Sequence, residues 1–250
     1  MAKTRFAALF AGTAFILLAP RGAAAQEIEL ASAAEGELQD LSDLSIEELA
    51  RINVRSASKT DEPLSEAPTA LYVITGDEIM ASAATSLPEA LRMAPNLQVQ
   101  QVDARQYAIT ARGFNSVETS NKLLVLIDGR SIYSPLASTV FWELHNRPVE
   151  DIEQIEVISG PGGTLYGPNA VNGVVNFITR DAHDTIGGLV RATAGDEERT
   201  VAARFGTPIG ANGAVRFYVT AFDREDLPPG LGPDVDDRFR GWHAGIECRR

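Results

Sequence analysis

The C-terminal part of the chain carries a regular alternation of apolar and polar positions. Apolar residues occupy every second position in three runs, of which Val215, Phe217, Val219 and Ala221 are the clearest example. Turn sequences such as residues 210–213 separate the runs. Alternation over segments of about ten residues predicts antiparallel strands with one apolar face. The opposite face carries arginine, threonine and tyrosine, which suits a water-filled interior, although a soluble meander packed on one core is an alternative interpretation.

A compact region of mixed helices and strands is predicted between residues 52 and about 181. Residues 123–127 are continuously apolar, which predicts a buried strand at the centre of its sheet. A short helix is expected from Thr75 towards Ala81, a second helix over residues 87–93, and one more helical turn over residues 148–152. The remaining strands are expected at residues 71–75, 97–102, 107–111, 155–158 and 171–179.

The first 25 residues are typical of a secretory signal peptide. Lys3 and Arg5 precede an apolar run at residues 6–19, and alanines at residues 23–25 form a small-residue cleavage site. The run of 14 residues is shorter than the roughly 20 that a membrane-spanning helix needs. We therefore expect the protein to leave the cytoplasm.

Residues 26–51 have the composition of a flexible, solvated arm. Eight acidic residues and no basic residue lie between Gln26 and Ala50. Within this arm, Ser45 and Glu48 have the spacing of a capping box, which predicts a short helix over residues 46–51.

Charge and side-chain chemistry disfavour several classes of function. The chain has 22 basic and 34 acidic residues, and its net charge of −12 argues against a nucleic-acid partner. The lone Cys248 excludes an intramolecular disulfide and a cysteine metal cluster, and the three histidines lack metal-ligand spacing. No nucleophile elbow, zinc-protease helix or cysteine–histidine pair occurs. We therefore expect no enzymatic activity, no cofactor and no resident metal.

A glycine-rich loop lies between the strands predicted at residues 155–158 and 171–179. Its glycines are Gly160, Gly162, Gly163 and Gly167. Because glycine allows close backbone approach, either a phosphate or another wall of protein could lie against this loop. No lysine follows the last glycine, which disfavours a nucleotide site.

A specific resemblance rests on several motifs that occur in one order. They are Glu66-Ala67-Pro68, Tyr72-Val73-Ile74-Thr75, Ala111-Arg112-Gly113-Phe114, Leu126-Ile127-Asp128-Gly129-Arg130 and residues 152–180. Together they resemble the plug domain of TonB-dependent outer-membrane receptors over residues 52–181. The alternating zone behind them, residues 182–250, resembles the first barrel strands, about three in number. The resemblance implies an α+β plug domain, with a small mixed β-sheet and short helices, followed by the start of an antiparallel transmembrane β-barrel.

The resemblance also implies partners. In this family the plug fills a barrel of about 22 strands, and ligand binds at the outer side of the plug. TonB, powered through its inner-membrane partners, pulls on the plug after pairing with an extended segment, the TonB box, by β-augmentation. The candidate TonB box, by position and apolar alternation, consists of Ile52, Asn53, Val54, Arg55, Ser56 and Ala57. The same residues could instead form the first plug strand.

Other site residues are expected from the same resemblance. Tyr133, Phe141 and Trp142, in a long loop, are candidates for ligand contact, although packing against the barrel wall explains them equally well. Arg112 matches the arginine that family plugs direct at barrel glutamates, and the four loop glycines are candidates for contact with the barrel. Ser159 stands where the family pattern has a second arginine, which weakens the expected anchoring of plug to barrel.

Two functions from different classes follow. The first is energised uptake of a bulky, scarce nutrient, such as a ferric siderophore or a cobalamin-like molecule, by an outer-membrane receptor. The 66 residues from Thr185 onward are fewer than even the smallest barrel of about eight strands needs, so a truncated receptor is expected. The alternative is a stand-alone periplasmic module that binds ligand or TonB without transport.

Overall fold

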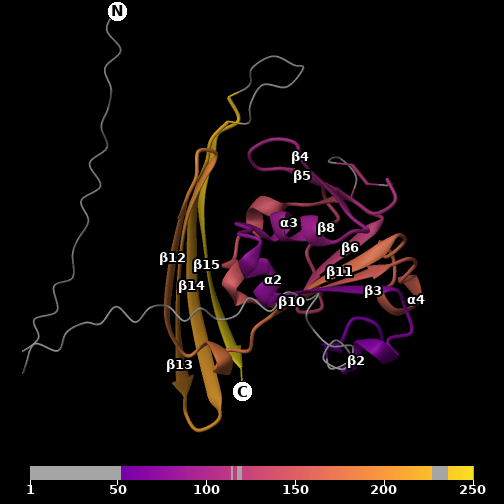
Figure 1. Ribbon diagram of the computed structural model, residues 1–250, viewed down its shortest axis with the longest axis horizontal. Helices are drawn as coiled ribbons and strands as arrows, with labels where there is room; N and C mark the ends of the chain where they lie inside the picture. Colours follow the sequence, from indigo (N-terminus) through magenta and orange to yellow (C-terminus); the bar gives the residue numbers. More distant parts are fainter. Residues whose placement is uncertain (1–51, 114, 117–119, 227–235, 250) are drawn as a thin grey trace, which may run out of the picture. The chain divides into compact units, whose positions relative to one another are not determined.

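The computed structural model describes residues 52–113, 115–116, 120–226 and 236–249 (Figure 1). The predicted signal peptide, the acidic arm and the predicted helix at residues 46–51 lie outside the described residues. Phe114, the last residue of the Ala-Arg-Gly-Phe motif, lies outside them as well.

A mixed five-stranded sheet forms the centre of the α/β region, residues 52–185. Its strand order is β3-β10-β11-β6-β7. β6 (Leu123–Ile127) pairs in parallel with β11 (Gly173–Thr179), whereas β10 (Ile152–Ser159) pairs antiparallel with both β11 and β3 (Leu71–Thr75). The predicted mixed sheet is therefore confirmed.

The predicted position of the apolar strand β6 is wrong in one respect. All five of its residues are buried, but β11 rather than β6 occupies the middle of the sheet. The reason is local: β6 runs at once into the tight turn at Asp128 and Gly129, both with positive φ. The chain then returns as β7 (Arg130–Ser131), which has only two residues and leaves β6 next to the edge.

Short helices cover this sheet where the sequence predicts them. α2 (Gly76–Ala81) begins with a complete capping box, in which Thr75 accepts from the Glu78 amide and the Glu78 carboxylate accepts from the Thr75 amide. α3 (Leu87–Ala90) continues as the 3₁₀ turn η3 (Leu91–Met93), and η5 (Val149–Asp151) is the helical turn before β10. No helix among the described residues is long and apolar enough to cross a membrane.

The other elements of the α/β region are short. They are β1 (Asn53–Val54), β2 (Glu62–Pro63), η2 (Leu64–Glu66), β4 (Gln98–Gln101), β5 (Tyr107–Thr110), β8 (Tyr133–Ser134), β9 (Thr139–Val140), η4 (Trp142–Leu144), α4 (Gly163–Tyr166) and η6 (His183–Thr185).

A second sheet contains four antiparallel strands in sequence order: β12 (Gly187–Ala194), β13 (Glu198–Ile209), β14 (Gly213–Arg224) and β15 (Phe239–Arg249) (Figure 1). About three strands were expected. β15 does not show the alternation of apolar and polar side chains, because two positions on its inner face are glycines. Gly241 and Gly245 lie opposite Phe222 and Tyr218, and a Cβ at Gly245 would lie 2.4 Å from the Tyr218 ring.

The two faces of the four-stranded sheet differ in chemistry, as the alternation predicts. One face exposes large apolar side chains; they include Val190, Val201, Phe205, Phe217, Val219, Trp242 and Ile246. On the other face, Arg216, Tyr218, Thr220 and Arg224 are buried. The inner face of this sheet therefore packs against the α/β region.

Candidate functional site

A cluster of charged side chains joins the α/β region to the four-stranded sheet. The α/β region contributes Arg147, Glu150 and Asp151, from the turn η5 and the residues just before it. Each strand of the sheet contributes one residue: Arg191, Arg204, Arg216 and Glu247, in strand order. We call these seven residues the interface cluster. One five-residue segment thus contacts all four strands.

The contacts in the interface cluster are short. The Arg191 guanidinium lies 2.8 Å from the Glu150 carboxylate, and the Arg147 guanidinium lies 2.8 Å from the Glu247 carboxylate. Arg216, which is 0% exposed, contacts Glu247 and donates a 3.0 Å hydrogen bond to the Arg180 carbonyl. Its charge is therefore balanced, as a buried guanidinium requires.

Asp151 lies at the centre of the interface cluster and is only 1% exposed. Its Oδ1 accepts a 2.6 Å hydrogen bond from Arg204, whereas its Oδ2 lies 3.7 Å from Arg216 Nε, too far for a hydrogen bond. Burial raises the pKa of Asp151 above its usual value, although both arginines act in the opposite direction. Removal of Arg204 would take away the hydrogen bond that this buried carboxylate accepts and leave it only the longer contact with Arg216.

The interface cluster differs from the anchoring expected from the sequence. Arg112 was the expected anchor, but it is exposed, has a positive φ of 60° and has no ion-pair partner among the described residues. Contact between Arg112 and a barrel glutamate remains a prediction. In the described structure Glu150 and Asp151 of the α/β region contact arginines of the sheet, whereas the pair of Arg147 and Glu247 has the opposite arrangement. The pair Glu150-Asp151 directly before a buried strand was the sequence signal that could have indicated this.

Protonation of His145, close to this interface, is expected to make the protein sensitive to acid. Burial, assisted by the positive charges of His243 and Arg147, lowers the pKa of His145. The folded state therefore favours the neutral ring. The stabilising contribution of His145 is present above its unfolded pKa of about 6.5, and it is lost as the pH falls through the lower folded pKa.

Denaturant titrations of the wild type and His145→Gln at about pH 7.5 and about pH 5.5 measure this effect. The loss of stability on acidification should be smaller in the variant. An identical loss in both proteins would contradict the assignment to His145.

The candidate TonB box, residues 52–57, is packed within the α/β region in this structure. Asn53 and Val54 form β1, which pairs with β2, and Val54 is 1% exposed. Ser56 and Ala57 are also buried. Pairing with another protein would therefore require this segment to leave its present place, and its role as a TonB box remains a prediction.

The glycine loop, residues 160–167, has neighbours from the α/β region. Gly160 and Gly167 have positive φ values of 109° and 78°, and a Cβ at Gly162 would lie 2.9 Å from Val174. A Cβ at Gly163 would meet no atom within 4 Å. The Tyr166 hydroxyl donates to the Ser56 carbonyl at 2.7 Å. Among the described residues, the loop thus contacts the N-terminal segment, and its predicted contact with the barrel remains untested.

The three aromatic residues proposed for ligand contact differ in their surroundings. Trp142 is 5% exposed, and its ring lies edge-on to Phe177 in the core, with centroids 6.3 Å apart. It therefore packs in the core of the α/β region rather than against a barrel wall, and it offers no free surface in this conformation. Tyr133 and Phe141 are half-buried, so ligand contact by these two residues remains a prediction.

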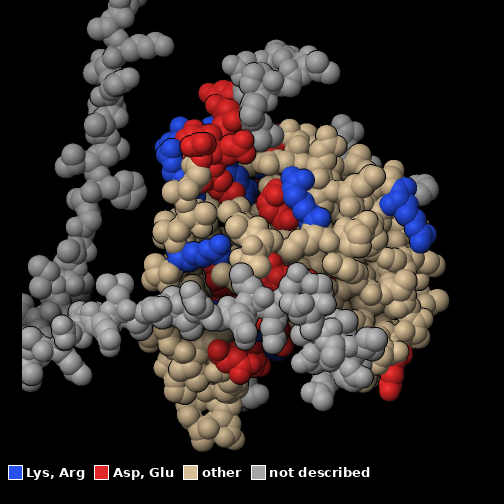
Figure 2. All heavy atoms as spheres, viewed as in Figure 1, with Lys and Arg blue, Asp and Glu red and all other residues tan. Residues whose placement is uncertain are grey.

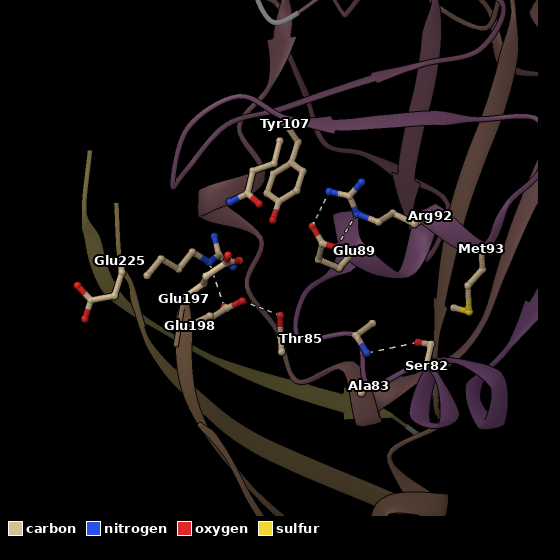
Figure 3. Close-up of a pocket in the computed structure, with 13 residues that line it drawn as sticks. Ser82, Ala83, Thr85, Glu89, Arg92, Met93, Tyr107, Glu197, Glu198 and Glu225 are labelled. Carbon is tan, nitrogen blue, oxygen red and sulfur yellow. Dashed lines mark hydrogen bonds and ion pairs between the residues drawn. The ribbon is translucent and has the colours of Figure 1, made fainter. Parts of the chain in front are cut away.

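A cavity of about 470 Å³ lies between the α/β region and the ends of β13 and β14 (Figure 3). Thr85 donates a 2.6 Å hydrogen bond to Glu198, which also accepts from Arg224 at 3.0 Å. Glu89 and Arg92 form a second ion pair, at 2.6 Å. Burial raises the pKa of Tyr107, so its hydroxyl remains a neutral donor in the wall. Sequence reasoning missed this cavity because its walls are far apart in the chain.

The rim of this cavity is strongly charged. Glu197 and Glu225 also line the cavity, so its four carboxylates exceed its two guanidiniums. Beyond Glu225, Arg238 contacts both Glu225 and Asp223, at 3.0 and 2.8 Å. Figure 2 shows acidic and basic side chains gathered at this end of the four-stranded sheet. The cavity is suited to a ligand that presents hydrogen-bond donors to carboxylate oxygens.

Sequence comparison identifies a protein family and curated proteins that are similar to this chain. The model of the TonB-dependent Receptor Plug Domain family matches residues 63–174. The vitamin B12 transporter BtuB of Vibrio vulnificus (strain CMCP6) is 34% identical over 198 residues, which cover 78% of this chain and 31% of that transporter. The chain thus spans about a third of the length of this curated relative.

Solved structures have the same fold. The ferric-catecholate import receptor Fiu from E. coli K12 has a TM-score of 0.52 and 29% identity, over 66% of this chain and 23% of that receptor. The ferripyoverdine receptor of the outer membrane of Pseudomonas aeruginosa, bound to ferripyoverdine, has a TM-score of 0.56 over 70% of this chain and 23% of its own. At 20% identity, the second likeness concerns the fold alone.

Proposed function

Since residues 63–174 are a plug domain of the TonB-dependent receptor family, we propose that the chain forms the plug and adjoining wall of a receptor for energised uptake of a bulky, scarce nutrient. The observation that carries this proposal is the position of the plug. It covers the polar face of a sheet whose opposite face is apolar, and the interface cluster joins the two.

The proposed mechanism follows from these two faces. Exposed side chains such as Val190, Trp242 and Ile246 suit the lipid of an outer membrane. The plug occupies the polar side, where solute would pass, so passage requires part of the plug to move. TonB supplies the force by pairing with the extended segment 52–57 through β-augmentation.

The same apolar face favours the receptor over a stand-alone periplasmic module. Val190, Phe205 and Trp242 would be exposed to water in a protein that stayed in the periplasm. Contiguous exposed apolar patches are rare on proteins surrounded by water and mark contact with lipid or another protein.

The ligand proposed for the cavity is a corrinoid or a ferric siderophore, the two classes in the names of similar receptors and transporters. The carboxylate oxygens that line the cavity can accept hydrogen bonds, which suits a ligand rich in amide or hydroxyl donors. Among these classes we favour a cobalamin-like molecule, because the relative at 34% identity is a vitamin B12 transporter.

Val54→Pro tests the proposed mechanism in cells in which the gene is expressed and other receptors for the same ligands are deleted. Proline cannot donate a backbone hydrogen bond, so pairing of the segment with TonB should fail. Uptake of labelled cyanocobalamin or ferric siderophore should fall to the level of cells without the gene, while ligand binding at the surface persists.

Val54→Ala is the matched control, since it shortens the same side chain but keeps the N–H. Normal uptake by Val54→Pro would exclude this segment as the TonB box. Absence of uptake and of binding in the wild type, for every ligand tested, would contradict the receptor itself.

A further inference from the structure

Two histidines from distant parts of the chain meet beside the interface cluster. His145 directly follows η4 in the α/β region, whereas His243 lies on β15, on the face that packs against that region. Both side chains are half-buried. The charge of His243 acts on His145, and the His243 ring interacts with the Asn146 main chain. We call His145 and His243 the histidine pair.

A buried aromatic ring brings an arginine next to the histidine pair. The Tyr218 ring centroid lies 5.8 Å from that of His243 and 5.6 Å from the Arg147 guanidinium. Tyr218 is 7% exposed, so water does not separate these groups. Arg147 acts electrostatically on both histidines. The surroundings of the histidine pair are therefore positive before either ring gains a proton.

The nearest carboxylate is already paired with arginines. Glu247 lies on the same face of β15 as His243, accepts from Arg147 at 2.8 Å and also contacts the buried Arg216. The other charged groups on the surrounding elements are Glu143, Asp151, Glu198 and Arg224. Asp151 and Glu198 have arginine partners of their own. Within the described part of the chain, no carboxylate influences the ionisation of either histidine.

The position of His243 accommodates a neutral ring better than a charged one. Its Nδ1 atom is buried and has no hydrogen-bond partner among the described residues. Thr220, directly opposite on β14, has a hydroxyl that is likewise buried and without a partner. Protonation would add a charged N–H group at Nδ1 with no acceptor, and an unpaired buried charge costs more than an unpaired neutral atom.

We propose that the histidine pair is a pH-sensitive switch that releases residues 145–147 from β14 and β15 in mild acid. Above the unfolded pKa of about 6.5 both rings are neutral and the contact is complete. As the pH falls below this value, protonation favours the separated state, in which water solvates the new charges. The lowered pKa of the His145 ring has the sign that this switch requires.

Release is confined to one edge of the interface. The contact between Arg147 and Glu247 is lost, but Glu247 keeps its contact with Arg216. The ion pairs of Glu150 and Asp151 with Arg191 and Arg204 do not involve the histidine pair, so they hold the rest of the interface together. The inference concerns contacts within the chain and goes beyond the proposed uptake, because it holds whichever ligand the protein binds.

Hydrogen exchange of the full chain in detergent, followed by mass spectrometry, measures this release. The amides of Leu144, His145 and Arg147 donate to carbonyls within their own segment, so exchange there reports on its opening. After correction for the intrinsic pH dependence, exchange in residues 142–148 should be about tenfold faster or more at about pH 5.5 than at about pH 7.5. Residues 152–159 on β10 should keep their protection.

Variants assign this change to the histidine pair. The double variant His145→Gln with His243→Gln carries no ring that can be protonated, so most of the acceleration should be lost. His183→Gln is the matched control, because His183 is an exposed histidine that pairs with Asp181 outside this interface. It should respond to acid as the wild type does. His243→Lys supplies a fixed charge and should accelerate exchange in residues 142–148 already at about pH 7.5.

Three results would overturn the proposal. The first is unchanged exchange of residues 142–148 on acidification of the wild type. The second is an acceleration of equal size in the double variant. The third is an acceleration that extends equally to residues 152–159, because it would show a general loss of stability rather than a local release. None of these measurements uses ligand or TonB, so they stand apart from the uptake assay with Val54→Pro.

Discussion

Replacement of Asp151 by alanine is expected to destabilise the packing of the plug on the four-stranded sheet by about 3–5 kcal/mol. Asp151 is buried between Arg204 and Arg216, and Arg216 is buried as well. The change removes the negative charge but leaves both guanidiniums in place. Chemical unfolding of the purified protein in detergent measures the loss.

Asp184→Ala is the control, because Asp184 is an exposed acid in the turn η6 and its loss should change stability by no more than about 0.5 kcal/mol. The double variant Asp151→Leu with Arg204→Met should be less destabilised than the sum of its single changes, since it removes a pair rather than one partner. Strict additivity, or a loss in Asp151→Ala no larger than in the control, would contradict the central position of Asp151.

Trp142→Ala is expected to lower the free energy of unfolding by about 3–5 kcal/mol, the range for deletion of a large aromatic ring from a core. Trp142 is buried and packs edge-on against Phe177, which is 0% exposed. The expected effect is therefore on the plug core. The same denaturant titration measures it.

Trp142→Phe separates packing from ligand contact. It keeps an aromatic ring against Phe177 and should retain most of the stability and all of the ligand affinity. If the folded Trp142→Phe protein bound ligand more weakly, Trp142 would contribute to ligand contact after all.

Local features of the fold could be predicted from the sequence because they depend on neighbouring residues. The capping box at Thr75 and Glu78 predicts the start of α2, and the apolar run of residues 123–127 predicts β6. Alternation predicts β13 and β14, with their faces correctly assigned. β15 was missed because Gly241 and Gly245 leave space for rings that belong to another strand.

The site depends on contacts between residues far apart in the chain, so local patterns could not predict it. Asp151 meets Arg204 and Arg216 only after two sheets have formed and packed. Glu156 meets Ser56 across a separation of 100 residues. The glycine loop was interpreted as a surface for a barrel wall, whereas its Tyr166 contacts the N-terminal segment in the described structure.

The most direct test of the central claim is the dependence of uptake on cellular energy. Cells in which the gene is expressed are given whichever labelled probe they bind, cyanocobalamin or a ferric siderophore, with and without an uncoupler of the proton-motive force. We predict that the uncoupler abolishes accumulation in the cell while binding at the surface is unchanged. Accumulation that continues at the same rate in uncoupled cells would contradict a plug that is opened by TonB.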